Sequence, residues 1–198
     1  MASHRHTDAA VLDAARDCVA SVGVRRTTVA DVARRAGASR MTVYRMFPDV
    51  RTLWSTLLTR ELSRVFDEAE SAAASLPTAR ARLVAAAAHT VREVSADPVV
   101  RKVLEVEPEL LLPYVTERLG QSQRLALERV RRLLEEGRGD GSIRDIDAGS
   151  AAYLVQLVCS SLIITVRVSE GEGDAGAVID AATEMLDAFL ARGQERAA

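Results

Sequence analysis

The sequence predicts an all-α protein of about nine helices, with a small N-terminal helical domain followed by a larger helical domain. Apolar residues recur at steps of three and four along most of the chain, which is the periodicity of amphipathic helices. Prolines and glycines divide these segments at short intervals, and the β-branched run at 162–168 has no second strand to pair with. A chain of 198 residues is long enough to give both domains a buried core.

Two short helices around a tight turn are predicted near the N-terminus. Thr28 begins a capping-box pattern, and apolar residues at helical spacing follow it over 29–36. Gly37 ends this helix, because a residue without Cβ accepts the left-handed conformation that a helix C-terminus usually needs. Ser39 caps a second helix, and Pro48 stops it. An additional helix over 8–22 is expected to pack across these two.

The second of these helices has one apolar face and one polar face. Val43 and Phe47 share the inner sector, and Met46 lies at its edge. The other face offers hydrogen-bond donors, an aromatic hydroxyl and an exposed methionine, which are groups that can read a DNA major groove. An ordinary helical hairpin with a solvated basic face is the alternative that this spacing leaves open.

These residues resemble the DNA-binding domain of the tetracycline-repressor (TetR) family. The similarity is carried by the runs TVADVA at 28–33, AGAS at 36–39 and TVYRMF at 42–47, in register and without gaps, and it extends over about 9–58. The resemblance implies a homeodomain-like helix-turn-helix domain at 1–48. It also implies a helical ligand-binding and dimerisation domain at 49–198, with a helix from about 49 linking the two.

The resemblance also assigns the DNA contacts. Base-reading positions are implied for Arg40, which suits guanine, for Met41, which suits a thymine methyl group, and for Thr42. Val50 and Met46 replace residues that often contact phosphates in the family, so phosphate anchoring falls on other side chains. The residues implied to bind DNA are Thr28, Arg40, Met41, Thr42, Tyr44, Arg45 and Arg51.

Dimerisation is expected from the last two helices. The helix over 151–168 is apolar nearly all round, and a helix that is apolar on every side must be covered on every side. Filling the monomer core would account for only one of its faces. In the family, the two C-terminal helices of each subunit form an intersubunit four-helix bundle. The candidate interface residues are Leu154, Val158, Leu162, Met185 and Phe189.

The resemblance further implies an inducer cavity between helices four to eight. A cavity lined by leucine, valine and alanine suits an apolar or amphipathic small molecule. Polar side chains on otherwise apolar faces are the candidates for orienting it, and a solvated or hydrogen-bonded core position is the alternative for each. These candidates are His89, Arg92, Tyr114 and Gln156.

Composition favours a DNA-binding protein of the cytoplasm. Residues 1–48 carry eight arginines and four aspartates, a net charge of +4, whereas the remaining 18 basic and 24 acidic residues give −6. A basic head on an acidic body is steered toward phosphates by its head. No apolar run reaches transmembrane length, and the N-terminus has no signal-peptide core. Cys18 and Cys159 are expected to be buried free thiols.

The expected function is therefore a ligand-responsive transcriptional regulator, with repression as the expected output. It would bind a palindromic operator as a homodimer and be released by the small molecule. A constitutive or protein-controlled DNA-binding regulator without an inducer is the alternative. The sequence shows no nucleophile paired with a base, no metal-ligand spacing and no phosphate-binding loop. We therefore expect no enzymatic activity, no metal site and no cofactor.

Overall fold

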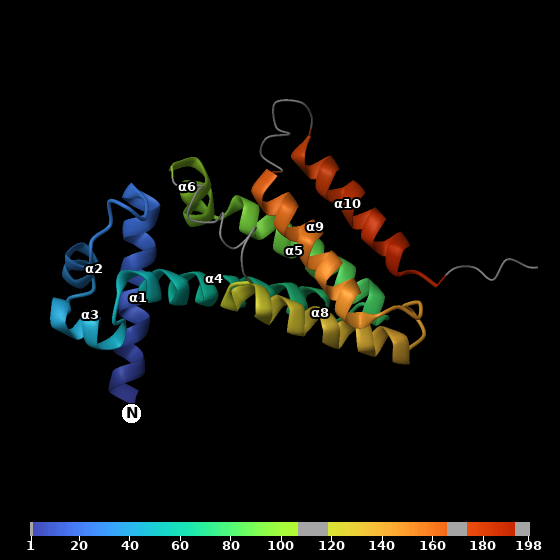
Figure 1. The fold of residues 1–198 in the computed structure, drawn as a ribbon, viewed down its shortest axis with the longest axis horizontal. Helices are drawn as coiled ribbons and strands as arrows, with labels where there is room; N and C mark the ends of the chain where they lie inside the picture. The colour runs from blue at the N-terminus through green and yellow to red at the C-terminus, as the bar shows by residue number, and fades with distance from the viewer. Residues whose placement is uncertain (1, 107–118, 166–173, 193–198) are drawn as a thin grey trace, which may run out of the picture. The chain divides into compact units, whose positions relative to one another are not determined.

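The computed structural model describes residues 2–106, 119–165 and 174–192 (Figure 1). Nine helices lie within these ranges, and their one β-type contact is an isolated bridge between Ile143 and Ala191. The predicted all-α class is confirmed. Contacts divide the chain into two compact units, Met1–Glu61 with Asp97–Arg118 and Leu62–Ala96 with Leu119–Ala198, called here the head unit and the body unit. The head unit takes in more of the chain than the predicted domain of 1–48.

The head unit contains α1 (Ala2–Val22), α2 (Val29–Arg35), α3 (Arg40–Met46), the first half of α4 (Val50–Ala73) and α6 (Pro98–Val106). Glycines with positive φ follow α1 and α2, at Gly23 (86°) and Gly37 (65°), as the predicted helix ends require. Helices α1 to α4 enclose one apolar core. Its most buried members are Val11, Ala15, Val32, Val43 and Leu53.

The body unit contains the second half of α4 and four further helices, α5 (Ala79–Ala96), α8 (Gln121–Gly139), α9 (Ala148–Thr165) and α10 (Ala175–Leu190). Helix α5 packs against α8, α9 and α10. One core cluster is centred on Leu83, Leu134, Ile143 and Leu190. Pro108 and Pro113 in the sequence predict a kinked entry into the helix that is α8 here, and both lie outside the described residues.

The glycine-rich stretch 137–141, which the sequence suggests is a flexible turn, is largely helical. Helix α8 continues to Gly139, and Gly137 is buried against Ile143. A Cβ atom at Gly137 would lie 2.4 Å from Ile143 Cδ1, so the glycine is needed for close packing. The following loop caps α5, since Asp140 accepts a 2.8 Å hydrogen bond from the Ala79 N–H. Tertiary packing therefore overrides the local glycine signal here.

Helix α9 is apolar but poorly covered. By length and composition alone it could cross a membrane, which differs from the expectation that no apolar run reaches that length, and 17 % of this 18-residue helix is buried. The buried residues are Ala151, Ala152 and Val155, which face the body core. Tyr153, Leu154 and Leu157 are instead 46 %, 38 % and 47 % exposed. Within the described residues of the body unit, one apolar face of α9 is thus left exposed.

Candidate nucleic-acid interface

Helix α3 is held by its cap and by two buried side chains. The Ser39 hydroxyl accepts a 3.0 Å hydrogen bond from the Thr42 N–H, which fixes the start of the helix. Val43 is fully buried, Phe47 is buried beside it, and Met46 packs against the same core. The orientation predicted from helical periodicity is confirmed. One face of α3 is anchored in the head core and the opposite face is left to solvent.

The solvent face of α3 carries four side chains that the fold does not use. Met41 exposes 78 % and Tyr44 47 % of its surface, and Arg40 and Arg45 are exposed beside them. Within the described residues, none of these four side chains forms a hydrogen bond or an ion pair. Two guanidinium groups, a phenol and a thioether on one helix can contact phosphates, base edges and thymine methyl groups. This face defines the candidate interface.

The two threonines implied to bind DNA are both engaged in helix caps. The Thr28 hydroxyl donates to Asp31 Oδ2 over 2.6 Å, and the Thr28 N–H donates to the same oxygen over 3.2 Å. Hydrogen bonds from Thr28 and then Arg34 lower the pKa of Asp31. The Thr42 hydroxyl shares a 2.8 Å hydrogen bond with that of Ser39. Thr28 has no donor left for a phosphate in this structure, because both of its donors go to Asp31.

Ion pairs decide which head arginines remain available. Arg34 pairs with Asp31 and Arg35 pairs with Asp17, at 2.6 and 3.1 Å. Arg51 is exposed in the first turn of α4, and within the described residues it makes no ion pair, nor do Arg40 and Arg45. Among the residues implied to bind DNA, these three arginines are therefore the cations that can meet phosphates without breaking an ion pair formed within the described residues.

Three of the four predicted ligand-orienting residues lie within the described part of the chain, and each has its own surroundings. Arg92 is half exposed and pairs with Asp180 on α10, and Gln156 donates to Ser160 over 2.7 Å. His89 is partly buried on α5, and Tyr114 lies outside the described residues. Arg92 thus has the solvated, paired position that was the alternative for it.

Two hollows lie within the body unit, and the ligand candidates line neither of them. The first has a volume of about 260 Å³ and is bordered by two arginine–glutamate pairs, Arg82–Glu136 and Arg132–Glu70, over alanines of α4 and α5. The second is an apolar gap of about 10 Å³ between α5, α9 and α10. A gap of that size has room for about one water molecule, so it holds no organic ligand in this conformation.

The candidate dimerisation residues fall into two groups. Leu154 and Met185 are exposed, at 38 % and 54 %, and Val158 is partly buried. Leu162 packs against the Val91–Ile179 core cluster, and Phe189 packs against the Leu83 cluster and under the Arg144 guanidinium. Sequence periodicity missed Tyr153, Leu157 and Val178, which are exposed on the same two helices. The all-apolar sequence of α9 gave no signal of which face the body covers.

The fold and the α3 face together define a helix-turn-helix DNA-binding protein. Residues 11–53 match the model of the bacterial regulatory proteins of the tetR family. An uncharacterized HTH-type transcriptional regulator from Mycobacterium tuberculosis is 33 % identical over 184 residues, which cover 93 % of this chain and 94 % of that protein. The chain belongs to the TetR family of transcriptional regulators, which is not a family of enzymes.

Solved structures share the whole fold. The transcriptional regulator FadR from Bacillus subtilis, in complex with stearoyl-CoA, has a TM-score of 0.68 at 17 % identity and covers 91 % of this chain and 98 % of its own. The TetR-family repressor AlkX from Dietzia sp., implicated in the biodegradation of n-alkanes, has a TM-score of 0.69 at 23 % identity, with 92 % and 94 % coverage. At these identities the likeness establishes the fold.

Proposed function

We propose that this protein is a cytoplasmic, ligand-responsive transcriptional repressor that binds a palindromic operator as a homodimer. The solvent face of α3 carries the proposal, since its four exposed side chains have the chemistry of base and phosphate contacts and no role in the fold. Arg40 and Met41 are assigned to bases, Tyr44 and Arg51 to phosphates, and Arg45 to either. Thr28 and Thr42 are assigned smaller roles, because their hydroxyls are engaged in caps.

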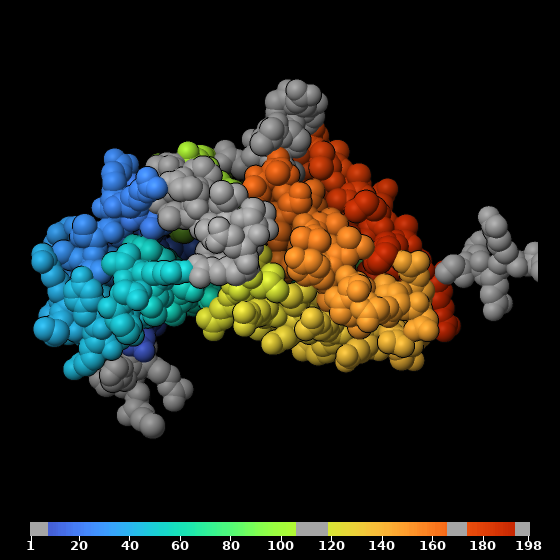
Figure 2. Space-filling model, viewed as in Figure 1, coloured from blue at the N-terminus to red at the C-terminus, as the bar shows by residue number. Residues whose placement is uncertain are grey.

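The exposed apolar face of α9 and α10 supports the homodimer. Tyr153, Leu154 and Leu157 on α9, with Val178 and Met185 on α10, expose between 38 % and 54 % of their surfaces. Figure 2 shows both helices at the surface of the body unit. Exposed apolar residues that cluster on adjacent helices mark an interaction site. A second copy suits it, because a twofold interface pairs the same patch on both subunits.

Dimerisation is also what operator binding requires. One α3 contacts too few base pairs for tight binding, whereas two heads spaced by about 34 Å, or one DNA turn, double the contacts. A twofold dimer then selects a palindromic site, because its two heads are identical.

An apolar or amphipathic effector is proposed for the body unit. The gap between α5, α9 and α10 is lined by Val91, Cys159, Leu162 and Ile179 among others, and a ligand would have to widen it. The stearoyl-CoA bound by the Bacillus subtilis neighbour supports acyl-CoA molecules as the first probes. An effector lowers DNA affinity only to the extent that it binds the DNA-incompetent state more tightly.

DNA-binding measurements test the interface. We would select the preferred duplex from randomised DNA with the native protein, then measure affinity by fluorescence anisotropy. Arg40→Ala and Tyr44→Ala should abolish binding while the protein remains a dimer, and Arg131→Ala on the exposed face of α8 is the matched control. Log affinity should also fall steeply with log salt concentration, since each head neutralises several phosphates. Native affinity in both α3 variants would refute the assignment.

A thermal-shift screen separates the ligand-responsive regulator from the constitutive one. Stearoyl-CoA, shorter acyl-CoAs and long-chain alkanes are the probes, and a ligand that binds the native state raises the melting temperature. A stabilising compound should also release the selected duplex. A flat response to every probe, with DNA binding intact, would favour constitutive or protein-controlled regulation.

A further inference from the structure

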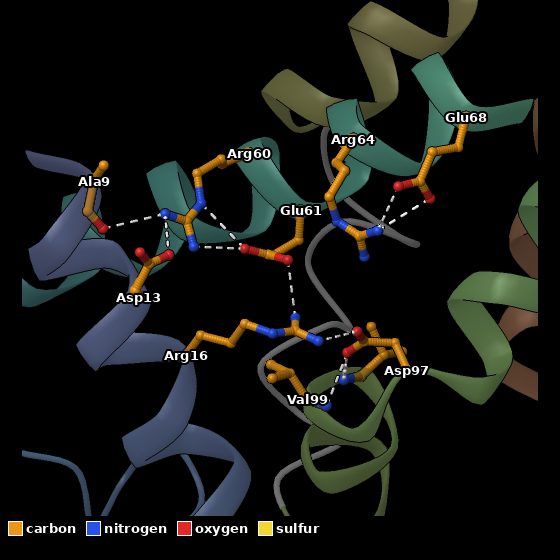
Figure 3. Close-up of polar contacts among 10 residues, drawn as sticks. Ala9, Asp13, Arg16, Arg60, Glu61, Arg64, Glu68, Asp97 and Val99 are labelled. Atoms are coloured by element: carbon orange, nitrogen blue, oxygen red, sulfur yellow. Dashed lines mark hydrogen bonds and ion pairs between the residues drawn. The ribbon is translucent and has the colours of Figure 1, made fainter. Parts of the chain in front are cut away.

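Arg16 of α1 contacts two residues at which the chain passes between the head and body units. The chain leaves the head unit after Glu61 and re-enters it at Asp97. Arg16 Nη1 donates to Glu61 Oε2 over 2.9 Å, and Nη2 donates to Asp97 Oδ2 over 2.8 Å (Figure 3). The Arg16 guanidinium therefore binds both residues at which the chain leaves and re-enters the head unit. Glu61 and Asp97 lie 45 and 81 residues away from it in sequence.

Asp97 also holds the start of α6. Its other carboxylate oxygen, Oδ1, accepts hydrogen bonds from the N–H groups of Val99 and Val100, over 2.8 and 3.1 Å. Helix α6 packs against α1 within the head unit. The Asp97 side chain thus joins the first turn of α6 to α1. If α6 moves along α1, either these hydrogen bonds break or Arg16 moves with Asp97.

The Arg16 contacts are better shielded from solvent than the neighbouring ion pair. The side chains of Arg16, Glu61 and Asp97 are 27 %, 15 % and 13 % exposed. In the adjacent pair of Arg60 with Asp13, the aspartate is 72 % exposed. Screening weakens exposed pairs more than partly buried ones, so the Arg16 contacts should be the stronger of the two sets.

We propose that Arg16 is a positioning residue that fixes the direction in which the chain enters and leaves the head, and thereby the spacing of the two heads on DNA. The planar guanidinium can donate to two carboxylates at once, which the single ammonium group of lysine cannot match in geometry. An effector that displaces α6 or α4 would act on operator affinity through these two contacts. The inference rests on the proposed DNA-binding homodimer.

The contacts of Arg16 with Glu61 and Asp97 are called the clamp below. Two variants and one matched control test the clamp. Arg16→Lys keeps the positive charge but loses the planar guanidinium that donates to both carboxylates. Asp97→Asn keeps an oxygen that can accept the hydrogen bonds at the start of α6 but loses the negative charge that pairs with Arg16. Asp13→Asn removes the exposed neighbouring pair. Each protein is measured against the full palindrome selected by the native protein, against one half-site, and against palindromes with spacers changed by one base pair.

The clamp predicts a selective loss. Both variants should bind the full palindrome about tenfold more weakly, a coupling in the range typical of linked sites. Their half-site affinity should match that of the native protein, and their preference for the native spacer should weaken. Asp13→Asn should bind all three duplexes as the native protein does. Hydrogen exchange at the amides of Val99 and Val100 should accelerate in Arg16→Lys, which reports the release of α6 without DNA.

Equal losses on palindrome and half-site would overturn the clamp, because they would indicate damage to the head itself. Native affinity and spacer preference in both variants would overturn it as well. If Arg16→Lys does not fold, Asp97→Asn decides alone, since it retains the cap. Failure of the proposed function looks different: there, the native protein would bind the palindrome no more tightly than the half-site.

Discussion

Replacing Leu157 by glutamate should convert the proposed homodimer to a folded monomer. Leu157 exposes 47 % of its surface on α9 in the single chain, so about half of it remains to be buried by a partner. Full burial of a leucine contributes about 1.5–3 kcal/mol, which leaves about 0.7–1.4 kcal/mol per side chain for dimerisation. A twofold interface contains the residue twice, so removing both contributions costs about 1.4–2.8 kcal/mol.

The introduced charge adds to that loss. Two carboxylates that must be desolvated without partners cost several kcal/mol more, so the dimer dissociation constant should rise by about a thousandfold or more. Sedimentation equilibrium measures this constant directly. Ala72→Glu, at an exposed position on α4, introduces the same charge away from α9 and should leave the dimer intact.

Two results would refute this reasoning. A Leu157→Glu protein that remains dimeric with native affinity would show that the exposed face of α9 is not the interface. A variant that unfolds would show that the residue supports the monomer, which its half-exposed position argues against. The expected variant is monomeric, melts near the native monomer temperature and binds only half-site DNA.

Further predictions concern the body unit and the thiols. Hydrogen bonds from the Ala79 N–H and from Ser142 lower the pKa of Asp140, so its stabilising effect is present above about pH 4, the unfolded value, and is lost as the pH falls through the lower folded pKa. Asp140→Ala should therefore lower the melting temperature at pH 7, and the difference should vanish in acid. Gly137→Ala should destabilise by about 1–3 kcal/mol in urea unfolding, because its Cβ would overlap Ile143. Burial raises the pKa of Cys159 to about 12 and also raises that of Cys18. The sequence predicts two buried thiols, and the structure buries Cys18 but only partly buries Cys159. Both thiols should react slowly with Ellman's reagent at pH 8 in the native protein and rapidly in guanidinium, and rapid native labelling would contradict this shielding.

The helix-turn-helix could be predicted from sequence because its determinants are local. The capping box of α2, the Ser39 cap of α3, the left-handed Gly37 and the inward position of Val43 all depend on residues within four positions of one another. Hydrogen bonds over such short separations follow from backbone geometry alone. The same locality explains why the exposed face of α3 was correctly identified.

Other features depend on packing between distant segments. The apolar sequence of α9 could not reveal that Ala152 faces the core while Leu157 faces solvent, because every side of the helix reads alike. The predicted ligand residues were separated for a similar reason. Whether Arg92 lines a cavity or pairs with Asp180 depends on where α10 lies, and periodicity within α5 does not encode that.

By itself, the sequence determined that this protein is a helical DNA-binding regulator with a basic reading head and an apolar C-terminal pair of helices. Only the tertiary structure decided which donors on the head are already engaged, which faces of α9 and α10 remain uncovered, and that Arg16 joins Glu61 to Asp97. Helix type and register follow from spacing along the chain. Contacts across 45 or 81 residues follow from the angles at which helices pack, and those angles are set by all the packed side chains together.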